Sequence, residues 1–275
     1  MQGWHSDEVI ATGSRDADIR DRGQIRNLFA RCRPDWTILA AAYTDVDGCE
    51  RNPELAHQVN CVGAGNIALA AREHQSRLML ISTDYVFDGT KSAPYESDDS
   101  TGPVNSYGVS KAAAEATVRG ILPDTCILRT SWLFGPSGVC FPNTILNAAA
   151  HKKQLRVVAD QCGCPTFNRD LAEAIVKLVQ ADAVGTIHAT NQGECTWFDF
   201  AQEITRVANY QDVTIAPIET KDLQRPARRP RYSVLSNSTL RKYGLSLRPW
   251  RQTVPDYIQE RSARDPRAEI VSNLQ

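Results

Sequence analysis

Apolar, β-branched runs alternate with amphipathic stretches along the first half of the chain. The runs are "EVIATG" (8–13), "WTILAAA" (36–42), "RLMLIST" (77–83) and "TCILRTSWLF" (125–134). Each has the length of a strand and is apolar nearly throughout, which is typical of strands that are buried on both faces. The pattern therefore predicts a parallel sheet.

The stretches between these runs have helical spacing and a helix-forming composition. They are "DRGQIRNLFARC" (21–32), "PELAHQVNCVGAGNIALAAREH" (53–74) and "SKAAAEATVRGI" (110–121). This alternation predicts an α/β fold, a Rossmann-like doubly wound parallel sheet. Ligands of such sheets bind at the carboxyl ends of the strands. Here those ends are Gly13, Ala42 to Thr44, Ser82 to Thr83 and Thr130 to Trp132.

The pattern changes after about residue 136. "LRVVADQ" (155–161) and "GTIHATN" (185–191) have the composition of short strands, and "WFDFAQEITRVANY" (197–210) that of a helix. We therefore expect one domain over residues 1–136 and a smaller lobe that makes up most of residues 137–275.

Composition and charge exclude several classes of protein. The 275 residues are 42% hydrophobic and carry a formal net charge of -1, with both signs mixed along the chain, which favours neither nucleic acid nor a lipid surface as partner. No run approaches the ~20 apolar residues of a membrane span, and "MQGWHSDEVI" does not resemble a signal peptide. We expect a cytoplasmic protein.

The eight cysteines are scattered through predicted strands and helices, so we expect reduced thiols rather than disulfides. Only Cys162 and Cys164, in "QCGC", lie close together. Because no second cluster of Cys or His has ligand spacing, we predict no zinc site and assign no metal ligands.

Tyr107 and Lys111, in "NSYGVSK", lie four residues apart at the start of a predicted helix. Residues at this spacing share one helix face, so the lysine ammonium can stabilise a phenolate whose ordinary pKa is near ~10. Such a tyrosine can protonate an alkoxide that develops during hydride transfer to a ketone. The alternative is a buried tyrosine beside a surface lysine.

Ser82 and Thr83 end the buried run "RLMLIST" and offer hydroxyl groups where a substrate carbonyl would lie. Isolated hydroxyl residues at strand ends are usually turn or cap residues. Together with Tyr107 and Lys111, they form a donor set for carbonyl reduction.

Blocks of sequence in register resemble the dTDP-4-dehydrorhamnose reductase family, a branch of the extended short-chain dehydrogenases/reductases. They include "RPDWTILAAAYTDVDGCE", "NPELAHQVN", "ISTDYVFDGT", "PVNSYGVSK", "LRTSWLFG", "LRVVADQCGCPTFNRDLA", "GTIHATNQGECTWFDFA" and "RPARRPRYSVLSNSTL". The resemblance covers nearly the whole chain from residue 8 to about residue 250. It implies that residues 1–136 bind a dinucleotide and that the smaller lobe binds substrate.

The resemblance implies a role for each matching residue. Tyr107 resembles the general acid, and it also faces the cofactor. Lys111 resembles the electrostatic partner of this tyrosine and a ligand of the cofactor ribose. Thr83 resembles the hydroxyl residue that polarises the 4-keto group. Asp84 and Trp132 resemble sugar-contacting residues.

Further matches concern the cofactor and the nucleotide of the substrate. Ala42, Tyr43 and Thr44 match a loop along the nicotinamide cofactor. Asp18 and Ile19 match a segment near the adenine of the cofactor. Arg228 and Arg229 resemble residues that close on the substrate nucleotide. Guanidinium groups suit diphosphate oxygens because they donate paired hydrogen bonds.

Ser14 and Arg15 bear on the choice of cofactor. They follow the run 8–13, which stands where the second strand of a dinucleotide-binding sheet is expected, and a carboxylate at that point would bind the adenosine 2'-hydroxyl of NADH. A hydroxyl and a guanidinium suit a 2'-phosphate better, so we expect NADPH, with NADH as the alternative.

The family begins with a strand and a glycine-rich turn whose helix N-terminus faces the pyrophosphate. Gly3 is the only glycine before Gly13, so we expect that the first strand is missing and that the chain is shortened at its N-terminus. The resemblance is also compatible with Mg²⁺ at a homodimer contact, but it assigns no ligands here.

The resemblance implies an enzyme that reduces dTDP-4-dehydro-L-rhamnose (dTDP-6-deoxy-L-lyxo-4-hexulose) to dTDP-L-rhamnose with NADPH. Two alternatives stay open. One is a non-catalytic, partner-binding module that resembles the β subunit of methionine adenosyltransferase. The other is a related nucleotide-sugar epimerase or dehydratase, which uses the same Tyr/Lys pair.

Overall fold

The computed structural model describes residues 8–264. Its main sheet is parallel, with strand order β1-β2-β3-β8. The bounds are Trp36–Leu39 for β1, Arg77–Thr83 for β2, Cys126–Thr130 for β3 and Gly185–His188 for β8. In this register Ser82 pairs with Arg129, and Thr83 pairs with Thr130. The predicted parallel sheet is therefore confirmed, and two predicted site strands end side by side.

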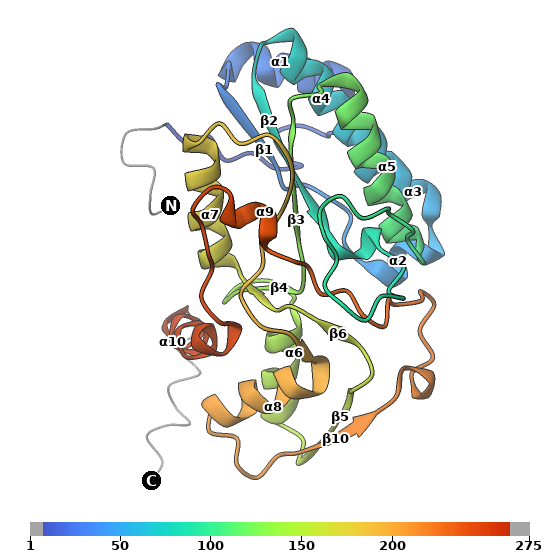
Figure 1. Ribbon diagram of the computed structural model, residues 1–275, viewed down its shortest axis with the longest axis vertical. Coiled ribbons are helices and arrows are strands. Elements are labelled where there is room, and N and C mark those ends of the chain that lie inside the picture. Colours follow the sequence, from blue (N-terminus) through green and yellow to red (C-terminus); the bar gives the residue numbers. More distant parts are fainter. Residues whose placement is uncertain (1–7, 265–275) are drawn as a thin grey trace.

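Helices cover both faces of this sheet (Figure 1). One face carries α1 (Arg22–Cys32), α4 (Gly63–Glu73) and α5 (Ser106–Ile121), and the other carries α7 (Asn168–Gln180) and α9 (Ser238–Arg241). Side chains alternate along β2: Leu78 and Leu80 pack toward α4 and α5, and Met79 packs toward α7. The doubly wound α/β fold is confirmed.

Short elements join the strands of the main sheet to its helices. After β1 come α2 (Val46–Arg51), α3 (Pro53–His57) and a π-helical turn, η1 (Gln58–Val62), which leads into α4. The stretch predicted as one helix over residues 53–74 is thus two helices that meet at a π turn. A 3-10 turn, η2 (Asp84–Val86), follows β2 directly.

A second cluster of buried side chains lies below the carboxyl ends of the main strands (Figure 1). Phe134, Phe200 and Tyr257 are at its centre. Its elements are β4 (Leu133–Phe134), α6 (Phe141–Ala149), β5 (Gln154–Val158), β6 (Cys162–Gly163), β7 (Thr166–Phe167), β9 (Cys195–Thr196), α8 (Trp197–Val207), β10 (Thr214–Ile218) and α10 (Val254–Arg264), with 3-10 turns η3 (Thr220–Asp222) and η4 (Trp250–Thr253). From here on, the smaller lobe means these elements; the predicted boundary at residue 136 stays a prediction.

Two sequence predictions about strands were wrong. Residues 8–13 were expected to form a strand, but they have no regular structure and are exposed, because no strand in residues 8–264 pairs with the outer edge of β1. The run 185–191 was expected in the smaller lobe, whereas β8 pairs with β3 in the main sheet. Continuous apolar runs identify buried strands but do not say which sheet they join.

None of the helices within residues 8–264 is both long and apolar enough to cross a membrane. All eight cysteines lie in this part of the chain and are free thiols, as predicted.

Candidate active site

Helix α5 carries Tyr107 in its first turn and Lys111 one turn later. The helix is capped by Asn105, whose side-chain oxygen accepts the Gly108 N–H at 2.8 Å. The same amide donates to the Arg228 carbonyl at 2.8 Å, so one residue fixes the helix start and a segment of the smaller lobe. The site predicted from "NSYGVSK" thus lies where the two parts of the molecule meet.

Gly108 lets α5 approach the end of β2 very closely. A Cβ at this position would lie 2.1 Å from the Tyr85 carbonyl oxygen, a distance that real atoms do not adopt. The Tyr107 phenol lies in the surroundings of the Thr83 side chain, which acts on its pKa. Tyr107 and Thr83, predicted as partners from distant stretches of sequence, are therefore neighbours.

Lys111 is buried, with 3% of its surface exposed. Its Nζ donates to the Ile81 carbonyl at 2.7 Å. Burial lowers its pKa to about 8, and the negative charge of Glu115 opposes the shift. Since an ammonium has three N–H groups, the side chain retains donors for a further ligand.

The pKa of Tyr107 is raised, mainly by burial, and the hydrogen bond with Thr83 acts in the opposite direction. The sequence predicted that Lys111 would lower this pKa. In the structure Thr83 is the group that does so, because the Lys111 ammonium is directed to a strand carbonyl. Tyr107 is thereby kept protonated, which is the form of a proton donor.

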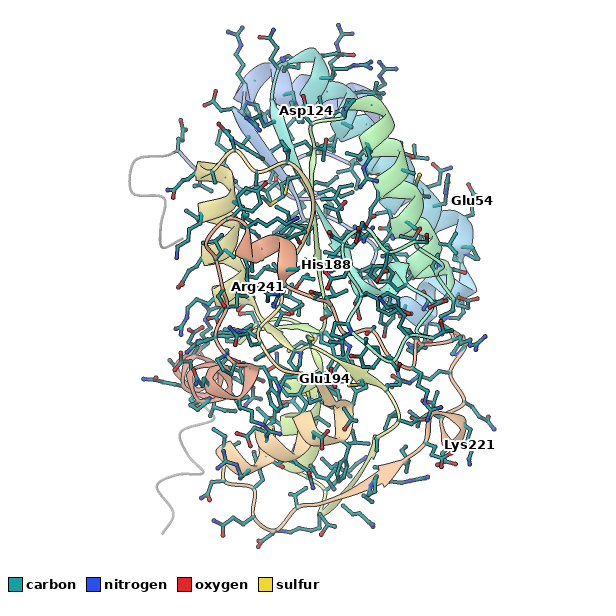
Figure 2. The ribbon with its side chains drawn as sticks, in the orientation of Figure 1. Glu54, Asp124, His188, Glu194, Lys221 and Arg241 are labelled. Atoms are coloured by element: carbon teal, nitrogen blue, oxygen red, sulfur yellow. The ribbon has the colours of Figure 1, made fainter. Side chains whose placement is uncertain are left out.

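A buried ion pair that the sequence did not predict lies behind Lys111. Glu115 accepts from Arg129 Nη2 at 2.7 Å and from Ser82 Oγ at 2.5 Å. Both charged side chains are about 5% exposed or less. Arg129 also approaches the ring of His188, a buried residue at the end of β8 (Figure 2). The spacing of Lys111 and Glu115, again four residues, was the available signal.

Asp84 follows Thr83 and is 2% exposed. Its Oδ1 accepts from Thr83 Oγ1 at 3.0 Å, and its Oδ2 accepts from Ser233 Oγ at 2.5 Å. Burial raises its pKa to about 7 against these hydrogen bonds. Both carboxylate oxygens of this predicted sugar contact face protein donors in the structure.

Trp132 has a positive φ of 45°, and the chain turns there between β3 and β4. Its ring stacks on Trp197 with centroids 3.4 Å apart and planes 7° from parallel. A Cβ on Gly163 would lie 2.5 Å from the Trp132 ring. The predicted run 125–134 is therefore two strands, and its break presents a half-buried aromatic pair, of which the sequence identified only Trp132.

The two predicted nucleotide-binding arginines have different surroundings. Arg229 Nη1 donates to Asp47 Oδ1 at 2.5 Å and to the Ala227 carbonyl at 2.6 Å, and only 10% of its side chain is exposed. This ion pair holds the pKa of Asp47 below its usual value. Arg228 is exposed and has no ion pair within residues 8–264.

The loop of Ala42, Tyr43 and Thr44 follows β1 and is tied to α5 through Asn60. The Asn60 amide accepts the Tyr43 N–H at 2.7 Å, donates to the Tyr43 carbonyl at 3.1 Å, and donates to Ser110 Oγ at 2.9 Å. Asn60 ends the block "NPELAHQVN" but was not predicted as a site residue. It fixes the predicted cofactor loop relative to the helix that carries Tyr107.

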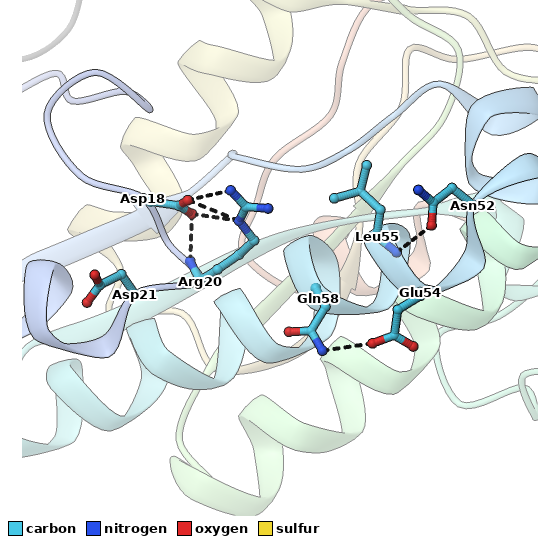
Figure 3. Close-up of a pocket in the computed structure, with 7 residues that line it drawn as sticks. All are labelled: Asp18, Arg20, Asp21, Asn52, Glu54, Leu55 and Gln58. Carbon is cyan, nitrogen blue, oxygen red and sulfur yellow. Dashed lines mark hydrogen bonds and ion pairs between the residues drawn. The ribbon is translucent and has the colours of Figure 1, made fainter.

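An open pocket of about 660 Å³ lies beside Asp18, and Figure 3 shows the side chains that line it. Asp18 is held in a bidentate ion pair by Arg20, which lowers the Asp18 pKa to about 2. The lining residues are Asp18, Arg20, Asp21, Asn52, Glu54, Leu55 and Gln58. The lining has three carboxylates, of Asp18, Asp21 and Glu54, and one guanidinium, of Arg20. Because this leaves an excess of negative charge, the pocket suits an uncharged base better than a phosphate.

Three further residues predicted near the cofactor, Ile19, Ser14 and Arg15, do not line this pocket. Ile19 contacts Gly63, where a Cβ would be 2.7 Å from its side chain. Ser14 and Arg15 are exposed. The remaining N–H donors of Lys111 fit the ribose of a dinucleotide, and the pocket beside Asp18 fits its adenine. Within residues 8–264 no group of three or more His, Cys, Asp or Glu side chains could hold a metal ion.

A doubly wound sheet that presents a tyrosine and a lysine one helical turn apart, with a strand-end threonine beside the tyrosine, defines the short-chain dehydrogenase/reductase class. Comparison with known proteins narrows this class. The RmlD substrate binding domain family matches residues 1–263. The chain therefore belongs to the RmlD substrate binding domain family.

Three relatives illustrate the family. The chain is 38% identical to the spore coat polysaccharide biosynthesis protein SpsK of Bacillus subtilis, over 93% of this chain and 90% of that one. It is 40% identical to the dTDP-4-dehydrorhamnose reductase of Mycolicibacterium smegmatis, over 91% and 77%. The crystal structure of dTDP-4-dehydrorhamnose reductase from Bacillus anthracis, in complex with NADP, is 36% identical and superposes with a TM-score of 0.88, covering 90% of this chain and 89% of that one.

Proposed function

We propose that this protein reduces the 4-keto group of dTDP-4-dehydro-L-rhamnose with NADPH and forms dTDP-L-rhamnose. The observation that carries the proposal is the Thr83, Tyr107 and Lys111 arrangement at the carboxyl end of β2, in a chain of the RmlD family. Relatives named dTDP-4-dehydrorhamnose reductase support the substrate, and an NADP-bound relative supports the cofactor.

In this proposal Tyr107 is the general acid. Burial keeps its phenol protonated, so it can donate its proton to the C4 oxygen as negative charge develops there. NADPH, when bound, supplies the hydride. Thr83 lies near Tyr107, and polarisation of the 4-keto group by Thr83 stays a prediction.

Lys111 contributes in two ways. Its charge, close to the end of β2, favours negative charge on the reacting oxygens, and its remaining N–H groups are available to a ribose. Ala42, Tyr43 and Thr44 would line the nicotinamide half, and Asp18 and Ile19 the adenine half, with Ser14 and Arg15 near a 2'-phosphate.

The substrate side rests on the aromatic pair and the arginine segment. Trp132, backed by Trp197, offers an apolar edge to the deoxysugar. Arg228 is free to bind the diphosphate, and Arg229 holds the segment against Asp47. Residues 1–136 would thus bind the dinucleotide and the smaller lobe the dTDP-sugar.

The test is consumption of NADPH by the purified protein with dTDP-4-dehydro-L-rhamnose, followed at the nicotinamide absorbance band. We expect turnover with NADPH and a lower kcat/KM with NADH. Absence of turnover, together with no measurable dinucleotide binding, would exclude the reductase and favour a partner-binding role.

A further inference from the structure

We propose that Arg129 is a positioning residue of the proposed reductase site, because it holds the Glu115 carboxylate away from Lys111 and thereby leaves the Lys111 ammonium to the cofactor and the reacting oxygens. The inference deepens the proposed function and rests on it. It gives a role to the buried ion pair of Glu115 and Arg129.

Lys111 and Glu115 have the spacing of an ion pair within one helix. They lie four residues apart on α5, where side chains of opposite charge come within reach of each other. Both are buried, with 3% and 4% of their surfaces exposed, and burial strengthens the attraction between opposite charges. Yet Lys111 Nζ donates to the Ile81 carbonyl at 2.7 Å, and within residues 8–264 Glu115 pairs with Arg129 instead.

Arg129 occupies both oxygens of the Glu115 carboxylate. Its Nε donates to Oε1 at 2.9 Å and its Nη2 donates to Oε2 at 2.7 Å, the paired geometry of a strong guanidinium–carboxylate contact. Ser82 Oγ donates a third hydrogen bond, to Oε1 at 2.5 Å. Because Ser82 and Arg129 are partners in the register of β2 and β3, their side chains lie on the same face of the sheet. The carboxylate is thus held toward the strands.

Arg129 is itself fixed by further contacts. Its Nη1 donates to the Ser97 carbonyl at 3.3 Å, and its guanidinium lies over the Phe87 ring, 5.0 Å from the centroid. His188 Nε2, at the end of β8, is 3.4 Å from Nη1. Burial lowers the pKa of His188 to about 3, so this ring is uncharged at neutral pH. These contacts keep the guanidinium directed at Glu115 and add no charge to the cluster.

The charges of the cluster show what Arg129 does for the site. Lys111 and Arg129 are two buried cations, and Glu115 is one buried anion. Since Arg129 neutralises Glu115, the remaining positive charge is that of Lys111. Without Arg129 the same carboxylate would pair with Lys111, and the site would lose the cation that stabilises negative charge on the reacting oxygens. Arg129 therefore acts on the reaction through Glu115.

The test follows the titration of Lys111 itself, in protein labelled with ¹³C at the lysine Cε. The Lys111 signal is assigned with Lys111→Met, and its pKa is measured without cofactor. Arg129→Met should raise this pKa by about one unit or more, because the Glu115 charge is no longer neutralised. Adding Glu115→Gln should bring the pKa back to the wild-type value or below. Arg248→Met, which removes a bidentate pair with Asp170, is the matched control and should leave it unchanged.

Two further variants separate the charge of Arg129 from its shape. Arg129→Lys keeps a cation beside Glu115 and should keep the wild-type titration. Arg129→Gln keeps a hydrogen-bond donor without the charge and should raise the Lys111 pKa, which covers the case in which Arg129→Met folds poorly. An unchanged Lys111 titration in Arg129→Gln, or in folded Arg129→Met, overturns the proposal.

Cofactor binding and turnover separate this inference from the proposed function. At neutral pH, Arg129→Gln should weaken NADPH binding and lower kcat/KM about tenfold or more, the effect of losing a charge-assisted hydrogen bond, and Glu115→Gln in the same chain should restore both. If the wild type consumes no NADPH but the Lys111 titration shifts as stated, the reductase proposal fails and the positioning role stands. If the wild type turns over and Arg129→Gln binds and reduces equally well, the positioning role fails and the reductase proposal stands.

Discussion

Tyr107 and Lys111 are tuned in opposite senses by the same burial. Burial keeps the phenol protonated and favours loss of the lysine proton, and each shift is opposed by one neighbour, Thr83 or Glu115. The residue types and their spacing were visible in the sequence. The direction of the Tyr107 shift was not, because it depends on where Lys111 Nζ points.

Replacement of Tyr107 by phenylalanine removes only the hydroxyl. We expect kcat to fall about 10²–10⁴-fold, the range for loss of a general acid, with little change in NADPH affinity. Steady-state kinetics and a fluorescence titration with NADPH measure the two effects. Tyr243→Phe, far from the site on the Val184 side of the sheet, is the matched control and should retain activity. Equal activity in both variants would exclude Tyr107 as the acid.

Lys111 should make stability depend on pH. Its pKa is about 8 in the folded protein against an ordinary value of 10.5, so the unfolded chain binds more protons between these values. The contribution of this group to the free energy of unfolding therefore rises with pH from about 8 to 10.5. Urea unfolding at pH 7.5 and 9.5 should show this rise in the wild type and a smaller one in Lys111→Met, which should also lose activity. The same pH dependence in both proteins would contradict the buried charge.

At the scale of elements, helix α5 brings the site together. Its existence was predicted from composition. Its start also has a local signal, because Asn105 is a typical N-cap residue. Its distance from β2 was not predictable, since Gly108 is an unfavourable residue inside a helix unless something packs against it. The break between β3 and β4 at Trp132 was not predicted either, because an apolar run in the sequence does not indicate which non-glycine residue adopts a positive φ.

Gly108→Ala should separate α5 from the turn after β2. The added methyl meets the Tyr85 carbonyl oxygen, so the helix must shift and Tyr107 moves away from Thr83. We expect at least a hundredfold loss of kcat/KM and a destabilisation of about 1–3 kcal/mol. Thermal unfolding and steady-state assays measure both.

Gly120→Ala, in the same helix, is the control. Nothing lies within 4 Å of the added Cβ, so the variant should gain about 0.5–1 kcal/mol of stability and keep its activity. If the two alanine variants behave alike, the close approach at Gly108 has no functional role.

At the scale of the whole molecule, the site lies between the main sheet and the smaller lobe. The segment with the two arginines crosses from one to the other and is held by Asp47, Asn105 and Asp84. The resemblance placed Asp84, Arg228 and Arg229 in the substrate site, but it did not identify Asp47 or Asn105. Their contacts join residues more than 120 positions apart, and local periodicity carries no information on such contacts.

Asp47→Asn should loosen this segment. The side chain is 20% exposed and pairs with a largely buried guanidinium, so the loss of charge weakens hydrogen bonds that contribute on the order of 1.5–3 kcal/mol. We expect the KM for the dTDP-sugar to rise about tenfold or more with a smaller change in kcat, and trypsin to cleave faster after Arg228 and Arg231, the two arginines of this segment that are not followed by proline. Asp212→Asn, whose ion pair with Lys153 is exposed, should change neither. Unchanged KM and cleavage in Asp47→Asn would show that the segment does not depend on this pair.

The most direct test of the account is the identity and stoichiometry of the product. Wild type and Tyr107→Phe are incubated with dTDP-4-dehydro-L-rhamnose and NADPH, and the sugar nucleotide is analysed by NMR spectroscopy. The account predicts one dTDP-L-rhamnose formed for each NADPH oxidised by the wild type, and at most about 1% of that rate in the variant. An unreduced keto-sugar with folded wild-type protein, or a reduced product with the opposite configuration at C4, would contradict it.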